Sequence, residues 1–148
     1  MTEKYDLFEQ VTFRGRRHGR KLRPRVQKLV EKNLPHFLVK EAIDRKKVDV
    51  NTFFPEKPRE VWLEIGFGAG EHIAWQAKRH PQIGFLGFEP YLNGVASLVR
   101  HSVSEKLSNI RIVPDDIRPF LIQLPDRCLS RIFILFPDPW PKPKHKKR

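Results

Sequence analysis

A glycine-rich turn between acidic residues is the first feature of this sequence that could do chemistry. Glycines alternate with other residues directly after an apolar run at positions 61–65, and Glu64 and Glu71 stand on either side of the turn. Glycines at such a turn let the backbone bend sharply and approach a ligand closely, although a glycine-rich turn can also exist without a ligand. The residues predicted to line a bound cofactor here are Gly66, Phe67, Gly68 and Gly70.

The spacing of these glycines separates two classes of cofactor. Dinucleotide-binding loops follow the pattern G-x-G-x-x-G and rest a pyrophosphate on the N-terminus of a helix. Here the pattern is G-x-G-x-G, and Glu71 occupies the place of the last dinucleotide glycine. Carboxylates beside a pyrophosphate would repel it, whereas S-adenosylmethionine has no phosphate and carries a sulfonium and an ammonium cation. The loop therefore favours S-adenosylmethionine over NAD.

Acidic residues also follow the next two apolar runs. Glu89 ends the second run, and Asp115 and Asp116 follow the third. Because ligands bind at the carboxyl ends of the strands in open α/β sheets, we expect Glu64, Glu89 and Asp116 at one edge. Glu89 could accept hydrogen bonds from both ribose hydroxyls of S-adenosylmethionine or of NAD. An acid after the third run could accept a hydrogen bond from the adenine amino group. We favour Asp116 for the adenine, because Asp115 suits a solvated turn or a helix cap equally well.

A proline-rich segment follows the fourth apolar run, which spans residues 131–136. Four prolines within residues 137–143 restrict the backbone and favour a stiff, extended loop. Such a loop at the cofactor edge would hold a catalytic residue in place, and Asp138 is the candidate. Trp140 could stack on a base, a contact worth roughly 1–3 kcal/mol, or it could pack on the sheet edge. The basic residues that would contact phosphates are Lys142, Lys144, His145 and Lys146.

Apolar runs alternate with helical periodicity from residue 60 onward. This alternation predicts an α/β, Rossmann-like fold with a parallel sheet and helices on both faces. A short helix that begins at Pro24 is expected before it, with an apolar face that extends to Leu34. The expected strands are 61–65, 84–89, 109–113 and 131–136, and the expected later helices are 71–78, 93–103 and 120–124.

The charge of the chain is unevenly distributed. The net charge is +12 over 148 residues, with +8 in residues 13–32 and +5 in residues 142–148, which leaves about −1 for the remainder. Basic segments on either side of a near-neutral core favour a nucleic-acid partner, although basic tails can also serve solubility alone. We expect residues 1–59 to form a basic arm, flexible up to about residue 22. Residues 60–148 would form the cofactor-binding core.

Other classes of protein are disfavoured by composition. No stretch approaches the about 18 apolar residues of a membrane span, and residues 1–15 lack the apolar segment of a secretory signal. Cys128 is the only cysteine, which argues against disulfides and cysteine-based zinc sites, and we expect no metal. A cytoplasmic protein is expected, as a monomer or a homodimer.

Two motifs resemble one known family. Residues 63–68 (LEIGFG) are typical of class I S-adenosylmethionine-dependent methyltransferases, and residues 136–142 (FPDPWPK) resemble the bacterial tRNA (guanine-N7-)-methyltransferase family. The resemblance implies a Rossmann-like class I methyltransferase fold and methyl transfer from S-adenosylmethionine to N7 of a guanine in tRNA. It also implies that Asp138 is the catalytic acid and that Lys142 and the basic residues after it contact the tRNA. The residues that match the cofactor contacts of the family are Glu64, Glu89, Asp116 and Asp138.

The chain departs from this family in two respects. Lys144 stands where members usually carry arginine, and lysine keeps the charge but lacks the bidentate fork. The sequence ends at Arg148, whereas members continue through further strands and helices that help to hold the guanine. We therefore expect a fold that is truncated after its fourth strand.

Three other functions remain compatible with the residues. An amino-group nucleic-acid methyltransferase is suggested by Asp138, Pro139 and Trp140, which loosely resemble a D-P-P-Y loop, but the second proline is absent and a basic run follows. A dehydrogenase is disfavoured by the glycine spacing. A non-catalytic, basic RNA-binding fragment would explain the missing C-terminal part.

Overall fold

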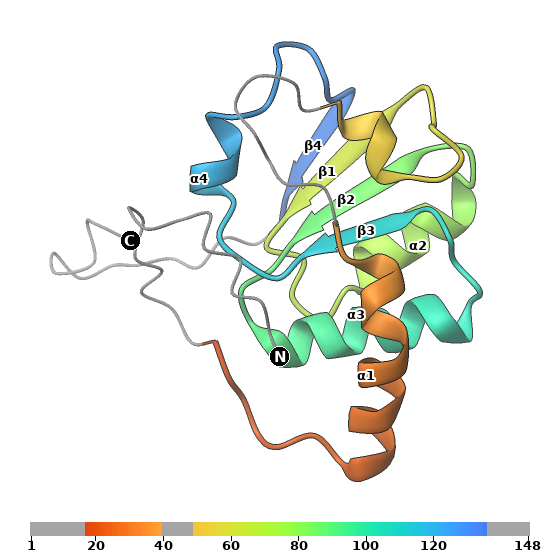
Figure 1. Cartoon of the computed structure of the whole chain (residues 1–148), viewed down its shortest axis with the longest axis vertical. Helices are drawn as coiled ribbons and strands as arrows, with labels where there is room; N and C mark the ends of the chain where they lie inside the picture. The colour runs from red at the N-terminus through yellow and green to blue at the C-terminus, as the bar shows by residue number, and fades with distance from the viewer. Residues whose placement is uncertain (1–16, 40–48, 136–148) are drawn as a thin grey trace, which may run out of the picture.

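The computed structural model describes residues 17–39 and 49–135 (Figure 1). Strands and helices alternate strictly after residue 60, as the periodicity predicts. The elements in chain order are α1 (Pro24–Phe37), the 3-10 helix η1 (Val50–Phe53), β1 (Val61–Ile65), α2 (Glu71–Arg79), β2 (Gly84–Phe88), α3 (Leu92–Ser104), β3 (Ile110–Val113), α4 (Arg118–Leu121) and β4 (Arg131–Ile134).

The strands form one parallel sheet in the order β3-β2-β1-β4. The chain moves outward from β1 through β2 to β3 and then returns across the sheet to place β4 on the other side of β1. The strand order therefore reverses beside β1, and this is the point at which open α/β sheets bind ligands. In register, Glu64 of β1 lies between Gly87 of β2 and Phe133 of β4. The predicted Rossmann-like sheet is confirmed.

Both faces of the sheet are covered over β1, β2 and β3, whereas Ile132 and Ile134 of β4 are exposed. On one face, α2 and α3 pack against side chains that include Trp62, Phe85 and Ile112, and α1 packs against α3 (Figure 1). On the other face, a second apolar cluster joins residues of η1 and α4 to the sheet through Phe54 and Phe120. Both of these phenylalanines are fully buried, and burial of each such side chain contributes about 1.5–3 kcal/mol.

The ends of several elements differ from the prediction. Helix α1 begins at Pro24 as expected but continues through Pro35 to Phe37. Phe37 is buried in the core, and this burial offsets the hydrogen bond that Pro35 cannot donate. Helix α4 begins two residues earlier than expected and ends at Leu121, and β4 ends at Ile134 rather than at residue 136.

The connection between α2 and β2 is held by one buried side chain. Asn109 Nδ2 donates hydrogen bonds to the carbonyl oxygens of Ala77, His80 and Ile83, over 3.0, 3.1 and 3.0 Å. These contacts attach the end of α2 to the beginning of β3. Within the two described ranges, no helix is both long enough and apolar enough to cross a membrane.

Candidate functional site

The glycine loop has a backbone that other residues rarely adopt. Gly66, Gly68 and Gly70 have φ angles of 67°, 57° and 84°, all in the left-handed region that favours glycine. A Cβ atom at Gly66 or Gly68 would meet no atom of residues 17–39 or 49–135 within 4 Å, whereas a Cβ at Gly70 would lie 2.7 Å from Cβ of Leu98. The loop therefore packs on α3 through Gly70 and leaves open space beside Gly66 and Gly68.

The loop is held between the end of β2 and the beginning of α3. The backbone N–H of Gly66 donates to the carbonyl of Phe88 over 2.8 Å. A Cβ at Gly94 would overlap the carbonyl oxygen of Gly68, so the first turn of α3 lies directly against the loop. The side chain of Phe67 is buried in the core beneath the loop, close to Gly87. Glycines on two neighbouring elements thus allow the loop to sit tightly in place.

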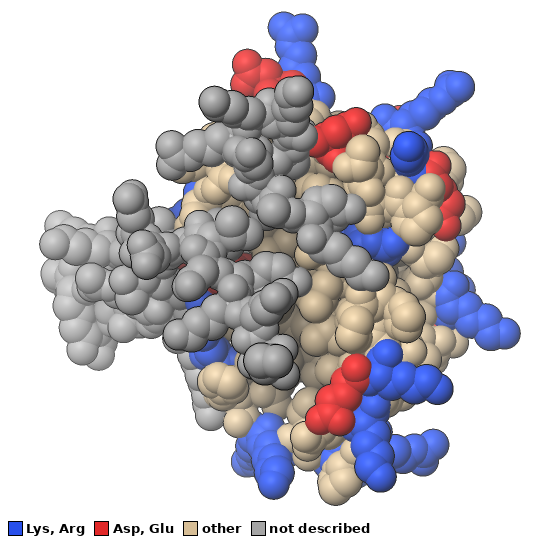
Figure 2. All heavy atoms as spheres, in the orientation of Figure 1, with Lys and Arg blue, Asp and Glu red and all other residues tan. Residues whose placement is uncertain are grey.

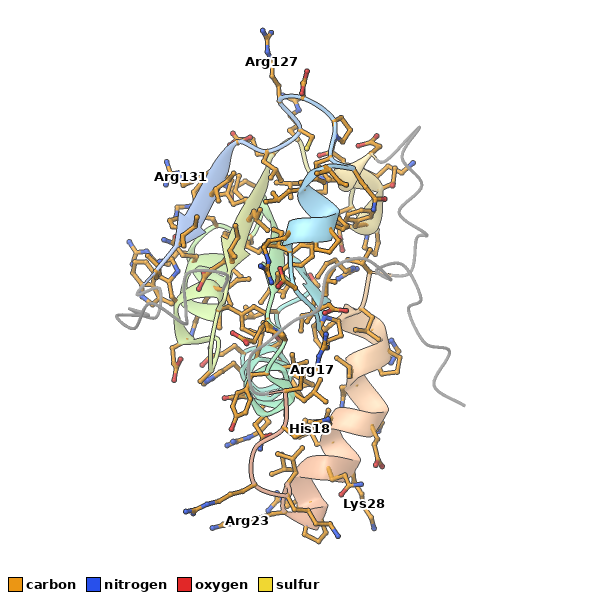
Figure 3. All side chains as sticks on the ribbon, turned by 90° about the vertical axis from the view of Figure 1, so that its left-hand side faces the viewer. Arg17, His18, Arg23, Lys28, Arg127 and Arg131 are labelled. Carbon is orange, nitrogen blue, oxygen red and sulfur yellow. The ribbon has the colours of Figure 1, made fainter. Side chains whose placement is uncertain are left out.

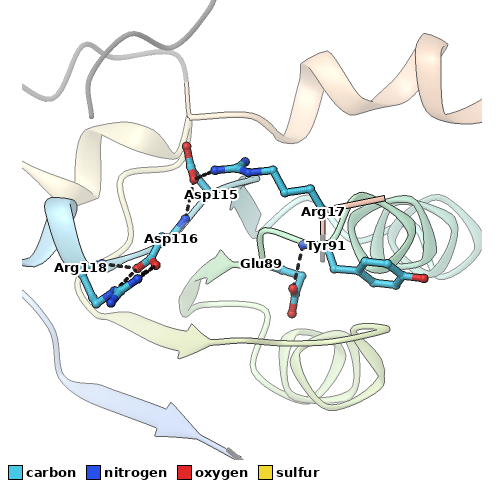
Figure 4. A network of polar contacts seen from close by, with 6 residues as sticks. All are labelled: Arg17, Glu89, Tyr91, Asp115, Asp116 and Arg118. Atoms are coloured by element: carbon cyan, nitrogen blue, oxygen red, sulfur yellow. Dashed lines mark hydrogen bonds and ion pairs between the residues drawn. The ribbon is translucent and has the colours of Figure 1, made fainter. Parts of the chain in front are cut away.

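Glu89 follows β2 and is fixed through both of its carboxylate oxygens. Oε2 accepts a hydrogen bond from the backbone N–H of Gly68 over 2.8 Å, and Oε1 accepts one from the N–H of Tyr91 over 2.9 Å (Figure 4). The side chain is buried. Each oxygen keeps acceptor capacity beyond these bonds, so Glu89 presents a fixed acceptor beside the glycine loop. Its ribose contact stays a prediction.

Glu64 lies near the end of β1 and is 4% exposed. Its Oε2 lies 2.7 Å from Nδ1 of His72, in the first turn of α2. Burial raises the pKa of Glu64 above its ordinary value, and the hydrogen bond and electrostatic interaction with His72 offset only part of that effect. Sequence reasoning did not single out His72. The signal was available, because α2 follows directly after the loop and its first turn must face the end of β1.

The two acids after β3 have different partners. Asp115 Oδ1 accepts from Arg17 Nη2 over 2.7 Å and from the backbone N–H of Asp116 over 2.8 Å. Asp116 binds Arg118, with Oδ1 2.9 Å from its backbone N and Oδ2 2.6 Å from Nη2 (Figure 4). Burial would raise the pKa of Asp116, but the hydrogen bonds and charge of Arg118, with the charge of Arg17, hold it below its ordinary value. Asp116 thus contacts the first residue of α4, and its adenine contact stays a prediction.

Residues 17–20 form a segment that we call the N-terminal strap, which lies along the start of α3. The carbonyl of Arg17 accepts from the backbone N–H of Leu92 over 2.8 Å. Asn93 accepts from the N–H of Gly19 over 2.8 Å through Oδ1, and donates to the carbonyl of Arg20 over 2.7 Å through Nδ2. The strap therefore satisfies an N–H at the beginning of α3, a helix without a side-chain cap.

Sequence reasoning did not predict these contacts of the N-terminal strap. Its partners lie more than 70 residues away in the sequence, so local composition carries no signal of them. Figure 3 shows Arg17 and His18 in this segment, Arg23 at the start of α1 and Lys28 on α1. The basic arm is therefore attached at the same edge of the sheet as Asp115.

Lysine and arginine side chains are exposed over the strap and α1. Figure 2 shows such side chains projecting from the lower part of the molecule, where α1 lies in Figure 1. The exposed basic residues of this region, which we call the α1 basic face, are Arg20, Lys21, Arg23, Arg25, Lys28 and Lys32.

Several predicted site residues lie outside the described residues. These are the catalytic candidate Asp138 and the substrate-binding candidates Trp140, Lys142, Lys144, His145 and Lys146. Their roles rest on the sequence alone. The structure therefore brings together Glu64, Glu89 and the glycine loop, with Asp116 nearby along the same edge of the sheet.

The acidic residues at this edge suit a cationic nucleoside rather than a dinucleotide. Glu64 and Glu89 are both buried acids next to the loop, and a pyrophosphate brought beside them would be repelled. The open space beside Gly66 and Gly68 leaves room for a ligand to approach the backbone. S-adenosylmethionine fits this arrangement, because it combines ribose hydroxyls with two positive charges.

Comparison with known proteins identifies the family to which the chain is similar. A family model described as "putative methyltransferase" matches residues 58–148. The chain is 45% identical over 141 residues to a tRNA (guanine-N(7)-)-methyltransferase of Paramagnetospirillum magneticum, which covers 95% of this chain and 59% of that protein. It is 46% identical over 134 residues to one of Caulobacter vibrioides (90% and 57%) and 41% identical over 148 residues to one of Chelativorans sp. (100% and 63%).

The chain spans about three fifths of the length of these curated relatives. The matched model covers more than half of the chain, and it includes the whole sheet and the glycine loop. The resemblance inferred from the two sequence motifs is confirmed. The chain therefore belongs to this methyltransferase family, in which its sequence is similar to the curated tRNA (guanine-N(7)-)-methyltransferases.

Proposed function

We propose that this chain carries the S-adenosylmethionine-binding part of a tRNA (guanine-N7-)-methyltransferase. The observation that carries the proposal is the geometry of the glycine loop. Its left-handed backbone leaves one side open to a ligand among the described residues, and the buried Glu89 carboxylate accepts a hydrogen bond from the N–H of Gly68. The similarity to curated enzymes of that name supports the choice of substrate. A cytoplasmic location is part of the proposal, because it follows from tRNA as the substrate.

Each residue of the site has a separate task in this proposal. When bound, S-adenosylmethionine supplies a methyl group on a positively charged sulfur. Glu89 accepts hydrogen bonds from the ribose, and the backbone of Gly66 to Gly70 lies against the cofactor. Glu64 provides negative charge near the sulfonium and ammonium groups. Asp116 is the proposed acceptor for the adenine amino group, for which its contact with Arg118 would have to be shared.

Methyl transfer to N7 of guanine requires alignment rather than proton removal. N7 carries a lone pair and no proton, so this lone pair forms the new bond to carbon while the carbon–sulfur bond breaks and leaves its electrons on sulfur. Positive charge consequently develops on the purine. Asp138 is the proposed catalytic residue, because a fixed carboxylate can stabilise this charge and orient the base. Placement of the two reactants would supply much of the remaining rate.

The tRNA would be held mainly through its phosphates. The α1 basic face and the basic residues from Lys142 onward are suited to neutralise phosphate charge. Asn93 and Asp115 both contact the N-terminal strap. The strap therefore connects the α1 basic face to the proposed cofactor edge. Trp140 is the proposed stacking surface for a base.

Two measurements test this function. Calorimetry of the chain with S-adenosylmethionine should show binding, whereas NADH should not bind. The complete product of the reading frame, incubated with tRNA and the cofactor, should yield RNA in which the new methyl group maps to N7 of guanine. A methyl group on an exocyclic amine would instead favour the amino-group methyltransferase, and RNA binding without cofactor binding would favour a non-catalytic fragment.

A further inference from the structure

Glu64 occupies an unusual position for a carboxylate. Its side chain lies on the same face of the sheet as α2 and is 4% exposed. In the sheet, its neighbours in register are Gly87 and Phe133, neither of which has a polar side chain. A buried carboxylate without a partner is costly, so the group that satisfies Glu64 decides whether its charge can be used.

His72 is that group among the described residues. Its Nδ1 lies 2.7 Å from Glu64 Oε2, and its Nε2 lies 3.2 Å from Nε2 of Gln76, one turn farther along α2. An amide nitrogen can only donate, so Nε2 of His72 must accept and the ring proton stays on Nδ1. Nδ1 therefore donates to Glu64, and the imidazole is neutral in this arrangement.

The His72 ring is also fixed by aromatic contacts. Its centroid lies 5.0 Å from that of Phe133 in an edge-on arrangement, with an interplanar angle of 67°. Phe133 belongs to β4, the strand next to β1, so the His72 ring on α2 also contacts this strand. Movement of the imidazole away from Glu64 would require this contact to break.

Among the described residues, Arg131 and Glu89 are charged groups on the elements next to β1, and each has contacts of its own. On β4, the Arg131 guanidinium lies 4.2 Å from the centroid of the Trp62 ring and 5.9 Å from that of Phe133. After β2, Glu89 is bound to the N–H groups of Gly68 and Tyr91. The pKa of Glu64 responds first to burial, which raises it, and then to His72, which lowers it.

We propose that His72 is a positioning residue of the cofactor site: oriented by Gln76, its neutral imidazole donates to Glu64 and keeps this carboxylate charged and aimed at the cationic end of S-adenosylmethionine. This inference rests on the proposed function, because only a cationic ligand gains from that charge. A histidine that served only to attach α2 to β1 would affect stability but not the pH dependence of cofactor binding.

Two variants of His72 separate these roles. His72→Phe keeps the shape of the ring but removes the donor, whereas His72→Asn keeps a donor close to the position of Nδ1. Loss of the donor raises the pKa of Glu64 further. As the pH falls, this variant should therefore lose its cofactor affinity at a higher pH than the unaltered chain does. His101→Gln, in the last turn of α3, is the matched control that removes a histidine elsewhere.

Calorimetry with S-adenosylmethionine across pH 5 to 8.5 gives the first readout. His72→Phe should weaken binding about tenfold or more at neutral pH and shift the midpoint of the pH profile upward. His72→Asn should recover most of the affinity, and His101→Gln should match the unaltered chain. Equal affinities and equal pH profiles for His72→Phe and the unaltered chain would overturn the inference while leaving the proposed function intact. Absence of cofactor binding by the unaltered chain would overturn both.

The second readout needs no cofactor. The ¹⁵N chemical shifts of the His72 ring should report a protonated Nδ1 and an unprotonated Nε2 near neutral pH. Gln76→Leu removes the donor that selects this tautomer and leaves Glu64 and His72 in place, so it also serves if His72→Phe fails to fold. We expect a mixed tautomer and severalfold weaker cofactor binding in Gln76→Leu. An unchanged tautomer together with unchanged affinity would contradict the proposed role.

Discussion

Arg17 and Asp115 lie 98 residues apart in the sequence, and their side chains meet over 2.7 Å between Nη2 and Oδ1. Asp115 also accepts the backbone N–H of Asp116, so the ion pair reaches the turn between β3 and α4. Together with the contacts of Asn93, it attaches the N-terminal strap to the ligand-binding edge of the sheet. The N-terminal strap and the proposed cofactor site thereby lie at the same edge of the sheet.

Asn93→Ala should release the N-terminal strap. The substitution removes two hydrogen bonds, from Gly19 N–H and to the Arg20 carbonyl, and should lower the free energy of unfolding by about 1–2 kcal/mol. Trypsin should also cleave faster after Arg17 and Arg20, because cleavage requires the strap to detach. Asn33→Ala removes a hydrogen bond within α1 and is the control, since it should leave cleavage at the strap unchanged.

Gly68→Ala should test the backbone of the loop. The φ angle of 57° costs a residue with a Cβ atom about 1–2 kcal/mol, and no atom in the described part of the chain adds to that cost. We expect a loss of unfolding free energy of this size in urea titrations, with weaker cofactor binding because the new methyl group fills the open side. Gly94→Ala should destabilise the chain more, since its Cβ would overlap the Gly68 carbonyl. Equal losses for the two variants would show that this overlap is easily relieved.

Asp116→Asn should change the response of stability to acid. Because the folded pKa of Asp116 is lowered, its contacts with Arg118 contribute stability above the ordinary value of 3.8, and this contribution is lost as pH falls through the folded pKa. The variant should therefore be less stable than the unaltered chain near neutral pH, and the difference should shrink in strong acid. Urea unfolding between pH 2.5 and 7 measures it, and a constant difference across that range would contradict the role of charge.

Asp138→Ala should abolish most methyl transfer while only partly weakening cofactor binding. Removal of a fixed group that stabilises developing charge typically costs about 10²–10³-fold in rate, whereas the proposed ribose contact of Glu89 does not depend on Asp138. Single-turnover methylation of tRNA and calorimetry with S-adenosylmethionine, both on the complete protein, separate the two effects. Near-unchanged turnover would refute the catalytic role of Asp138.

Arg25→Ala combined with Lys28→Ala should weaken tRNA binding through fewer phosphate contacts. Both residues are exposed on α1, and removal of two such contacts should lower the slope of log affinity against log salt by about 2. Filter binding or fluorescence titration at several salt concentrations measures this slope. Arg59→Ala is the control, because Arg59 precedes β1 and lies at the amino edge of the sheet, opposite the cofactor edge. Equal slopes for the two variants would argue against the α1 basic face as a tRNA contact.

The order of the elements, the parallel sheet and the position of the acids at the strand ends were all predictable from the sequence. These features follow from local patterns: apolar runs bounded by glycine and proline identify strands, and parallel strands in alternation with helices align their carboxyl ends at one edge. The positions of Glu64, Glu89 and the glycine loop were predictable for that reason. The family was also readable from two short motifs, because they are contiguous in the chain.

The partners of these residues depend on how the chain is folded. His72 meets Glu64 across the loop, Arg17 meets Asp115 from the other end of the chain, and Asp116 turns to Arg118 rather than standing free. A side chain makes such contacts according to distances in space, which depend on how helices pack on the sheet and not on spacing in the sequence. The same packing decides which carboxylate is buried, and burial sets how readily each one carries charge.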